Sequence, residues 1–236
     1  MWPLVPLGAA AAAGCAAWAV RGRSSQVFAP SVWRGPAARR AIALTFDDGP
    51  SERTPELLEL LAQYGAAATF FQCGHNAERL PEIARAVSRA GHAIGNHTYS
   101  HPPLWLRSRA FIEDEVGRAQ RALTGIHGAA PRLFRAPYGV RWPGLAAAQQ
   151  RHALTGVMWS TMGRDWVAPA AQIARRLARG TRPGAVFCLH DGRALSPNPD
   201  LHAMLSALET ALPRWREGGY EFLTVPALFE WQAVTC

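Results

Sequence analysis

From residue 41 onward, short apolar runs alternate with stretches of helical periodicity. The first apolar run, Ala41–Phe46, precedes an amphipathic stretch that carries Leu57 and Leu61, and the last one is Glu221–Val225. Repeated strand-then-helix units predict a parallel sheet covered by helices. When such a sheet closes into a barrel, functional groups gather at the C-terminal ends of the strands. We therefore expect an α/β fold whose chemistry lies directly after the strands.

Turn residues and caps set the limits of these elements. Thr54, followed by Pro55, is predicted to cap the first helix, and Gly91 is predicted to end another. The expected strands cover Ala41–Phe46, Ala67–Gln72, His92–Asn96, Leu133–Arg135, Leu154–Trp159, Ala185–Leu189 and Glu221–Val225. The first expected helix follows the Thr54 cap. The other expected helices cover Pro81–Ala90, Arg109–Leu123, Leu145–His152, Ala170–Arg179, Leu201–Trp215 and Ala227–Trp231.

The N-terminal region has a different composition. Pro3–Val20 is uncharged and Ala-rich. Its length suits a signal segment or membrane anchor within residues 1–20, so we expect membrane contact through residues 3–20; a buried Ala-rich helix is the alternative. Residues 21–40 contain Arg, Pro, Gly and Ser and are predicted to be a basic linker. The folded domain is then expected to cover residues 41–233.

The sequence is compatible with two locations of the protein. Arg21 and Arg23 follow the apolar segment, which favours a catalytic domain on the cytoplasmic face. A polymeric substrate outside the cell favours a membrane-associated or exported protein of the cell envelope. We expect the envelope and keep the cytoplasmic face as the alternative; the sequence says nothing of the oligomeric state.

Charge and cysteine content exclude several classes of protein. The formal net charge is +8 and every basic side chain is arginine. This balance permits an anionic partner, although a solvated arginine-rich surface explains it equally simply. The sequence shows no zinc-finger spacing and no basic-aromatic RNA motif, so we expect no nucleic-acid partner. The sequence has four cysteines, which are too dispersed for a disulfide framework: Cys15, Cys73, Cys188 and Cys236. Cys73 and Cys188 lie in or after apolar runs and are expected to be small buried side chains.

Two adjacent carboxylates follow the first predicted strand. Thr45–Pro50 reads Thr-Phe-Asp-Asp-Gly-Pro, which places Asp47 and Asp48 immediately before a turn. Neighbouring side chains of an extended chain point in opposite directions, but a turn at Gly49 can direct both into one site. Like charges at this distance need a positive partner. An aspartate turn that caps the following helix is the alternative interpretation.

The second motif is a pair of histidines, His97 and His101, four residues apart. Pro102 disfavours helical geometry at His101, so a loop is expected to bring the imidazoles together. Two imidazoles and the Asp48 carboxylate form a set that suits Zn²⁺ or another divalent metal, with positions left for water and substrate. Surface or hydrogen-bonded histidines are the alternative.

Three further motifs also carry candidate residues. Arg135, two residues before Pro137, offers a counter-charge for a carboxylate, and the tight turn at Tyr138 can present a backbone N–H to an oxyanion. His190 ends the most apolar strand and is a candidate general acid if Asp165 orients it. Trp166 and Leu189 are candidate walls of an acetyl-sized slot, and core packing is their alternative role.

Taken together and in this order, the five motifs resemble those of the polysaccharide deacetylase family (carbohydrate esterase family 4, the NodB-homology domain). The resemblance covers about Ala41 to Phe229 and includes Ala68–Phe71, Gly91–Asn96 and Trp159-Ser160. It implies a distorted (β/α) barrel of about seven parallel strands. The fourth motif departs from the family pattern, because Met162 stands where an aspartate is usual.

The resemblance also implies a role for each residue. Asp47 corresponds to the general base, and Arg135 to the residue that positions it. Asp48, His97 and His101 correspond to the metal triad. The Tyr138 N–H corresponds to the oxyanion donor. Asp165 corresponds to the residue that tunes the acid, and His190 to that acid.

The function expected from these roles is a metal-dependent hydrolase that removes N-acetyl groups from N-acetylglucosamine units of a chitin-like or peptidoglycan glycan. Zn²⁺ is the favoured metal, with Co²⁺, Ni²⁺ and Mn²⁺ as alternatives. Two other functions stay open. The same machinery can act on an acetylxylan ester or a lipid-linked formamide, or the fold can serve a non-catalytic glycan-binding protein.

Overall fold

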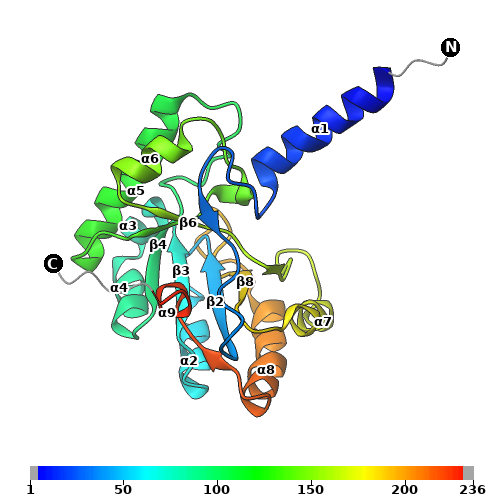
Figure 1. Ribbon diagram of the computed structural model, residues 1–236. Helices are drawn as coiled ribbons and strands as arrows, with labels where there is room; N and C mark the ends of the chain where they lie inside the picture. Colours follow the sequence, from blue (N-terminus) through cyan, green and yellow to red (C-terminus); the bar gives the residue numbers. More distant parts are fainter. Residues whose placement is uncertain (1–4, 231–236) are drawn as a thin grey trace.

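The computed structural model describes residues 5–230, and within them nine strands form one parallel sheet (Figure 1). Its order is β1-β6-β5-β4-β3-β2-β8-β7, with β9 paired to β2. The strands are β1 Ser31–Val32, β2 Ala41–Asp47, β3 Ala68–Gln72, β4 Ala93–Asn96, β5 Leu133–Phe134, β6 Thr155–Val157, β7 Thr161–Met162, β8 Ala185–His190 and β9 Glu221–Phe222. The expected α/β fold, a distorted barrel of parallel strands, is confirmed.

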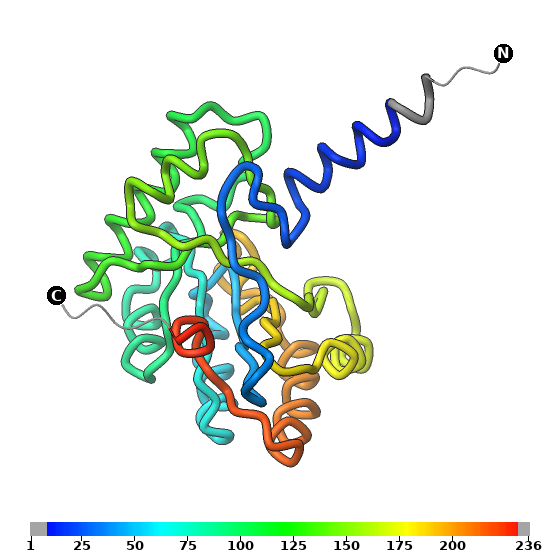
Figure 2. Tube along the Cα trace, in the orientation of Figure 1, coloured from blue at the N-terminus to red at the C-terminus, as the bar shows by residue number. Residues whose placement is uncertain are grey.

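Helices connect the strands and cover the sheet, as the chain trace in Figure 2 shows. They are α1 Val5–Arg21, α2 Thr54–Gln63, α3 Gly74–Arg79, α4 Pro81–Arg89, α5 Arg109–His127, α6 Leu145–Arg151, α7 Ala170–Gly180, α8 His202–Glu217 and α9 Val225–Leu228, with a short 3₁₀ turn at Pro137–Gly139. Helix α5 is capped at both ends. The Ser108 hydroxyl accepts from the Phe111 N–H, and Gly128 ends the helix with a φ of 75°.

The central strands separate two sets of side chains, and this separation positions the site. All seven residues of β2 are buried, as expected for a strand covered on both faces. Ile42, Leu44 and Phe46 pack with the helices of the largest core cluster, whereas Ala41 and Ala43 belong to a second cluster on the other face. By the alternation of a strand, Asp47 continues the second set and points into the curve of the sheet.

Some expectations differ from the structure at the ends of elements. Thr54 is the first residue of α2 and not its cap, because its hydroxyl donates to Asp191 Oδ2 at 2.7 Å and accepts from the Ser51 N–H at 2.9 Å. Residues 21–40, expected as a linker, contain β1, which pairs with β6. The expected end of the catalytic domain at residues 231–233 and the cysteine at position 236 lie outside the described residues.

The N-terminal apolar segment forms α1, which projects away from the rest of the molecule in Figure 1. Among residues 5–230, no helix has the length and hydropathy required of a bilayer-spanning segment. The C-terminal end of α1 contacts the domain, since the Arg141 N–H donates to the Val20 carbonyl at 3.0 Å.

Candidate active site

The two adjacent aspartates diverge at the end of β2. Asp47 is the last residue of the strand, and Asp48 adopts a φ of 71°, a left-handed conformation that a non-glycine residue rarely takes. The chain therefore reverses at Asp48, which is held in place by the Ala194 N–H on its Oδ2 at 2.9 Å and by Asn76, whose amide donates to its carbonyl at 2.7 Å. Backbone strain of this kind is concentrated at functional sites.

Asp48 meets both predicted histidines. Its Oδ1 lies 3.3 Å from His97 Nε2 and 3.0 Å from His101 Nε2, and all three side chains are buried. Burial alone would raise the pKa of the Asp48 carboxyl, but contacts with His101 and His97 hold that pKa well below its usual range. One carboxylate and two imidazoles, with donor atoms within 4.8 Å of one another, fit a divalent cation.

Two further observations support this fit. Asp48 Oδ1 is buried and accepts no hydrogen bond of good geometry from the described residues. An oxygen whose partner is a metal ion is expected to have this environment. The His97 Nδ1 lies 2.8 Å from the Arg135 carbonyl, which can only accept, so Nδ1 carries the proton and Nε2 is free to bind a cation. Asp48, His97 and His101 are together the residues that could hold a metal.

The loop that carries the histidines is shaped by Glu115 of α5. The buried Glu115 carboxylate accepts from the backbone N–H of Tyr99 at 3.1 Å, from that of Ser100 at 2.9 Å and from the Ser100 hydroxyl at 2.8 Å. Thr98 and His101 both have positive φ, at 66° and 58°. The expected loop geometry is confirmed, and Glu115 compensates for the backbone strain of that loop.

We expect Glu115→Ala to weaken Zn²⁺ binding by about 10–100-fold, the usual effect of removing a group that orients metal ligands. The loss of three hydrogen bonds frees the loop, and His101 then leaves its position. Competition with a chromogenic chelator measures the affinity. Asp114→Ala, on the exposed face of the same helix, is the matched control. Equal Zn²⁺ affinity in the two variants would contradict the role of Glu115.

Asp47 is paired with Arg135, the fully buried arginine that follows β5. Arg135 Nη1 donates to Asp47 Oδ1 at 2.6 Å and to the Thr45 hydroxyl at 2.6 Å. Its Nε and Nη2 donate to the carbonyls of Val157 and Met158 at 3.1 and 3.2 Å. The guanidinium is thus fixed by four acceptors, and it holds the Asp47 carboxylate in one orientation.

His190, at the end of β8, is paired with Asp165. The His190 Nδ1 lies 3.0 Å from Asp165 Oδ1, and the His190 N–H donates to Asp165 Oδ2 at 2.9 Å. Burial opposes protonation of the imidazole, but the charge and hydrogen bond of Asp165 raise the pKa of His190 to about 9. The Trp166 ring stands at 82° to the imidazole with centroids 5.0 Å apart, which fixes the imidazole plane.

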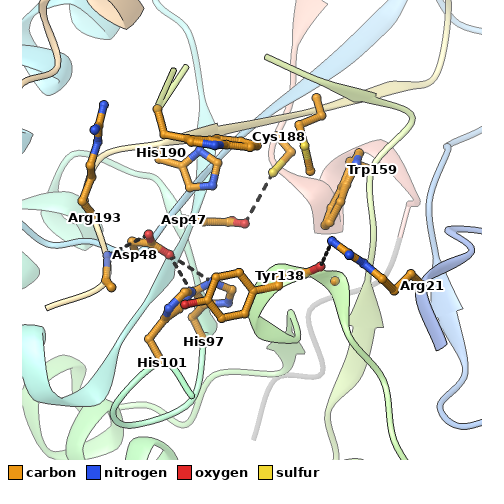
Figure 3. A pocket seen from close by; sticks show the side chains of 15 residues that line it. Arg21, Asp47, Asp48, His97, His101, Tyr138, Trp159, Cys188, His190 and Arg193 are labelled. Atoms are coloured by element: carbon orange, nitrogen blue, oxygen red, sulfur yellow. Dashed lines mark hydrogen bonds and ion pairs between the residues drawn. The ribbon is translucent and has the colours of Figure 1, made fainter. Parts of the chain in front are cut away.

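These groups surround one cavity of about 360 Å³ (Figure 3). In this view His190 faces the metal triad across the cavity, and Asp47 lies between them. Tyr138 lines the same cavity from the 3₁₀ turn, with a φ of 58° and its ring 4.8 Å from that of His101. The predicted residues Asp47, Asp48, His97, His101, Tyr138, Trp166 and His190 all line it, and Arg135 and Asp165 hold two of them.

Leu189 is the exception. It is fully buried in the largest core cluster and does not line the cavity, because alternate residues of β8 face opposite sides. The structure therefore places Leu189 in the core and not in the cavity wall where we expected it. Its neighbour Cys188 faces the cavity, with its thiol 3.5 Å from Asp47 Oδ2.

Other residues that the sequence did not indicate also line the cavity. Arg21, Arg193 and Met162 line the cavity together with Trp159. Met162 and Trp159 lay within or beside recognised motifs, but no sequence signal pointed to Arg21, which lies more than a hundred residues from most of the site.

Comparison with known proteins agrees with this geometry. The family model described as polysaccharide deacetylase matches residues 34–157, more than half of the chain. A peptidoglycan-N-acetylglucosamine deacetylase of Bacillus cereus is 34% identical over 204 residues, which cover 83% of this chain and 70% of the relative. A chitooligosaccharide deacetylase of Azorhizobium caulinodans is 37% identical over 199 residues, which cover 79% of this chain and 93% of that protein.

Among solved structures, the Bc1960 peptidoglycan N-acetylglucosamine deacetylase superimposes with a TM-score of 0.79 at 33% identity. The superposition covers 85% of this chain and 92% of that one. Sequence and fold thus point to the same relatives. The chain belongs to the polysaccharide deacetylase family.

Proposed function

We propose that this protein is a Zn²⁺-dependent hydrolase that removes N-acetyl groups from N-acetylglucosamine units of a peptidoglycan or chitin-like glycan. One observation carries the proposal. A single cavity holds a carboxylate–imidazole triad for a cation, a separate carboxylate fixed by arginine, and an imidazole fixed by a second carboxylate. Cleavage of an amide by water needs an electrophilic centre, a base and an acid.

Asp48, His97 and His101 would hold the cation. When bound, it supplies Lewis acidity, which polarises the acetamide carbonyl and lowers the pKa of a coordinated water. Two nitrogen ligands favour Zn²⁺ over Mg²⁺ or Ca²⁺, which prefer oxygen, and leave Co²⁺, Ni²⁺ and Mn²⁺ as substitutes.

The side chains divide the proton transfers between them. Asp47, held by Arg135 at 2.6 Å, accepts the proton of the attacking water. The Tyr138 backbone N–H, at the cavity rim, donates to the developing oxyanion. His190 protonates the departing sugar amine from Nε2, because its Nδ1 is engaged by Asp165. The products are acetate and a glucosamine unit.

Acetate release from chitotetraose and from peptidoglycan fragments tests this function. We expect turnover by the Zn²⁺-loaded protein, loss of turnover with an excess of dipicolinate, and recovery when Zn²⁺ is restored. Turnover that persists after complete removal of metal, verified by elemental analysis, would contradict the role of the triad.

Two alternatives give different results in the same assay. An enzyme for ester or formamide groups would release acetate from acetylxylan or formate from a formylated amino sugar, and would leave chitotetraose unchanged. A non-catalytic glycan-binding protein would bind Zn²⁺ and glycan without turnover on any of them. The Asp165–His190 pair argues against the second alternative, because a binding protein has no need of a general acid.

A location in the cell envelope, with membrane contact through residues 3–20, follows from these polymeric substrates as part of the proposal. Sedimentation with vesicles of phosphatidylglycerol and phosphatidylethanolamine tests the membrane contact. We expect the full chain to sediment and a variant that lacks residues 1–17 to stay in solution.

A further inference from the structure

The end of α1 forms part of the active-site rim. Arg21 lines the catalytic cavity, where its side chain approaches the Tyr138 carbonyl at 3.5 Å (Figure 3). A second, more open cavity of about 410 Å³ lies beside it and is lined by Trp18, Arg21, Gly22, Arg23, Ser24 and Trp159. Arg21 and Trp159 line both cavities, so the two adjoin at these residues, and we refer to them together as the groove.

A buried arginine holds this part of the rim in place. Arg141 is 2% exposed, and its Nη1 donates to the Ser25 carbonyl at 2.5 Å while its Nη2 donates to the Gly22 carbonyl. The Ser25 hydroxyl in turn donates to the Ala19 carbonyl at 3.1 Å. Arg141 therefore fixes the turn after α1 against the domain.

Trp18 is held by the same turn. A Cβ on Gly22 would lie 2.5 Å from the Trp18 indole, so only glycine lets this ring pack on the backbone. Trp18 is nevertheless 50% exposed, which leaves much of its surface open at the second cavity.

The second cavity is positively charged. Arg21 and Arg23 are exposed, and none of the residues that line this cavity is acidic. Each guanidinium has five N–H donors; within residues 5–230, Arg23 donates to the Ser160 carbonyl and Arg21 to the Tyr138 carbonyl, so both keep donors for a ligand. Guanidinium groups favour carboxylates, and tryptophan rings offer flat apolar surface to a sugar ring.

We propose that this groove binds a sugar that carries a carboxylate, next to the N-acetylglucosamine unit that is deacetylated. Arg21 and Arg23 pair with the carboxylate, and Trp18 and Trp159 contact the ring. The proposal rests on the deacetylase function and narrows its substrate to acidic glycans, such as strands that contain muramic acid. Residues 18–24 precede the region that the family model matches.

The experiment compares two forms of one tetrasaccharide, in which N-acetylglucosamine alternates with N-acetylmuramic acid. In one form the lactyl carboxylates are free, and in the other they are converted to neutral amides. The readout is the ratio of kcat/KM for the acidic form to that for the neutral form. We expect a ratio well above one for the wild-type protein. It should fall when NaCl rises from about 0.05 to about 0.5 M, because salt screens exposed charges.

The double variant Arg21→Gln, Arg23→Gln should lower this ratio by about tenfold, the effect of losing a charged hydrogen bond. Arg21→Lys with Arg23→Lys should retain part of the preference, and Arg175→Gln, on an exposed face of α7, is the matched control that leaves the ratio unchanged. Thermal unfolding of each variant verifies the fold.

The outcomes separate the two proposals. If the wild-type protein releases acetate from neither tetrasaccharide nor chitotetraose, the deacetylase function fails. If it deacetylates them but the ratio is close to one, or if the Gln variant keeps the wild-type ratio, the acidic subsite fails. Loss of binding to phosphatidylglycerol vesicles by the Gln variant, with an unchanged ratio, would instead assign the arginines to a lipid surface.

Discussion

Asp47→Asn should lower kcat by a factor of about 10²–10⁴ while the protein still binds one equivalent of Zn²⁺. Asparagine has the shape of aspartate and can still accept the hydrogen bond that Arg135 Nη1 donates to Asp47 at 2.6 Å in the wild-type protein. It cannot accept a proton from water at neutral pH. Because Asp47 is separate from the triad, the loss falls on proton transfer and leaves metal binding intact.

The neighbouring residue provides the matched control. Asp48→Asn removes the only carboxylate of the triad and should abolish both Zn²⁺ binding and turnover. Initial rates of acetate release on chitotetraose, with metal content measured by elemental analysis, distinguish the two substitutions. If Asp47→Asn keeps a tenth or more of the wild-type kcat, Asp47 is not the base. If it loses the metal as Asp48→Asn does, Asp47 and Asp48 do not have separate roles.

The sequence predicts this site well because the fold places strand ends together. Asp47 and His190 follow the two most apolar runs of the chain, and β2 and β8 pair in register with Asp47 opposite His190. Parallel strands bring their C-terminal ends to one edge, so residues far apart in the chain converge there. The alternation of strands and helices could also be predicted, because elements such as β2 and α5 are long enough to show their period.

The misses share a different cause. Leu189 is expected either in the wall of an acetyl-sized slot or in the core, and alternation along β8 turns it toward the helices of the core. Strand β1 has two residues and α3 has six, too few for any period to show. Arg21 reaches the cavity only because Arg141 holds the turn after α1, a tertiary contact across more than a hundred residues.

The second large effect concerns pH. His190 acts as an acid, so it must be protonated, and activity should fall as the pH rises through its pKa. That pKa is raised to about 9, although burial opposes it, because Asp165 stabilises the imidazolium. A dication in the triad repels the imidazolium, so the metal-loaded enzyme should lose activity at or below about pH 9. His190→Ala should lower kcat by about 10²–10⁴-fold at pH values below this limb, and the difference from the wild type should shrink above it.

Asp165→Asn sharpens this test, because it removes the charge and leaves an oxygen that can accept from His190 Nδ1. With the stabilising charge gone, burial is less strongly opposed and the pKa of His190 falls below about 9. The alkaline limb of kcat against pH should then move to lower pH, so the variant loses most activity above neutrality and recovers part of it in mild acid. A uniform loss with no shift of the limb would mean that Asp165 only supports the fold around β8. If the His190→Ala variant keeps the alkaline limb of the wild-type protein, the acid is another group.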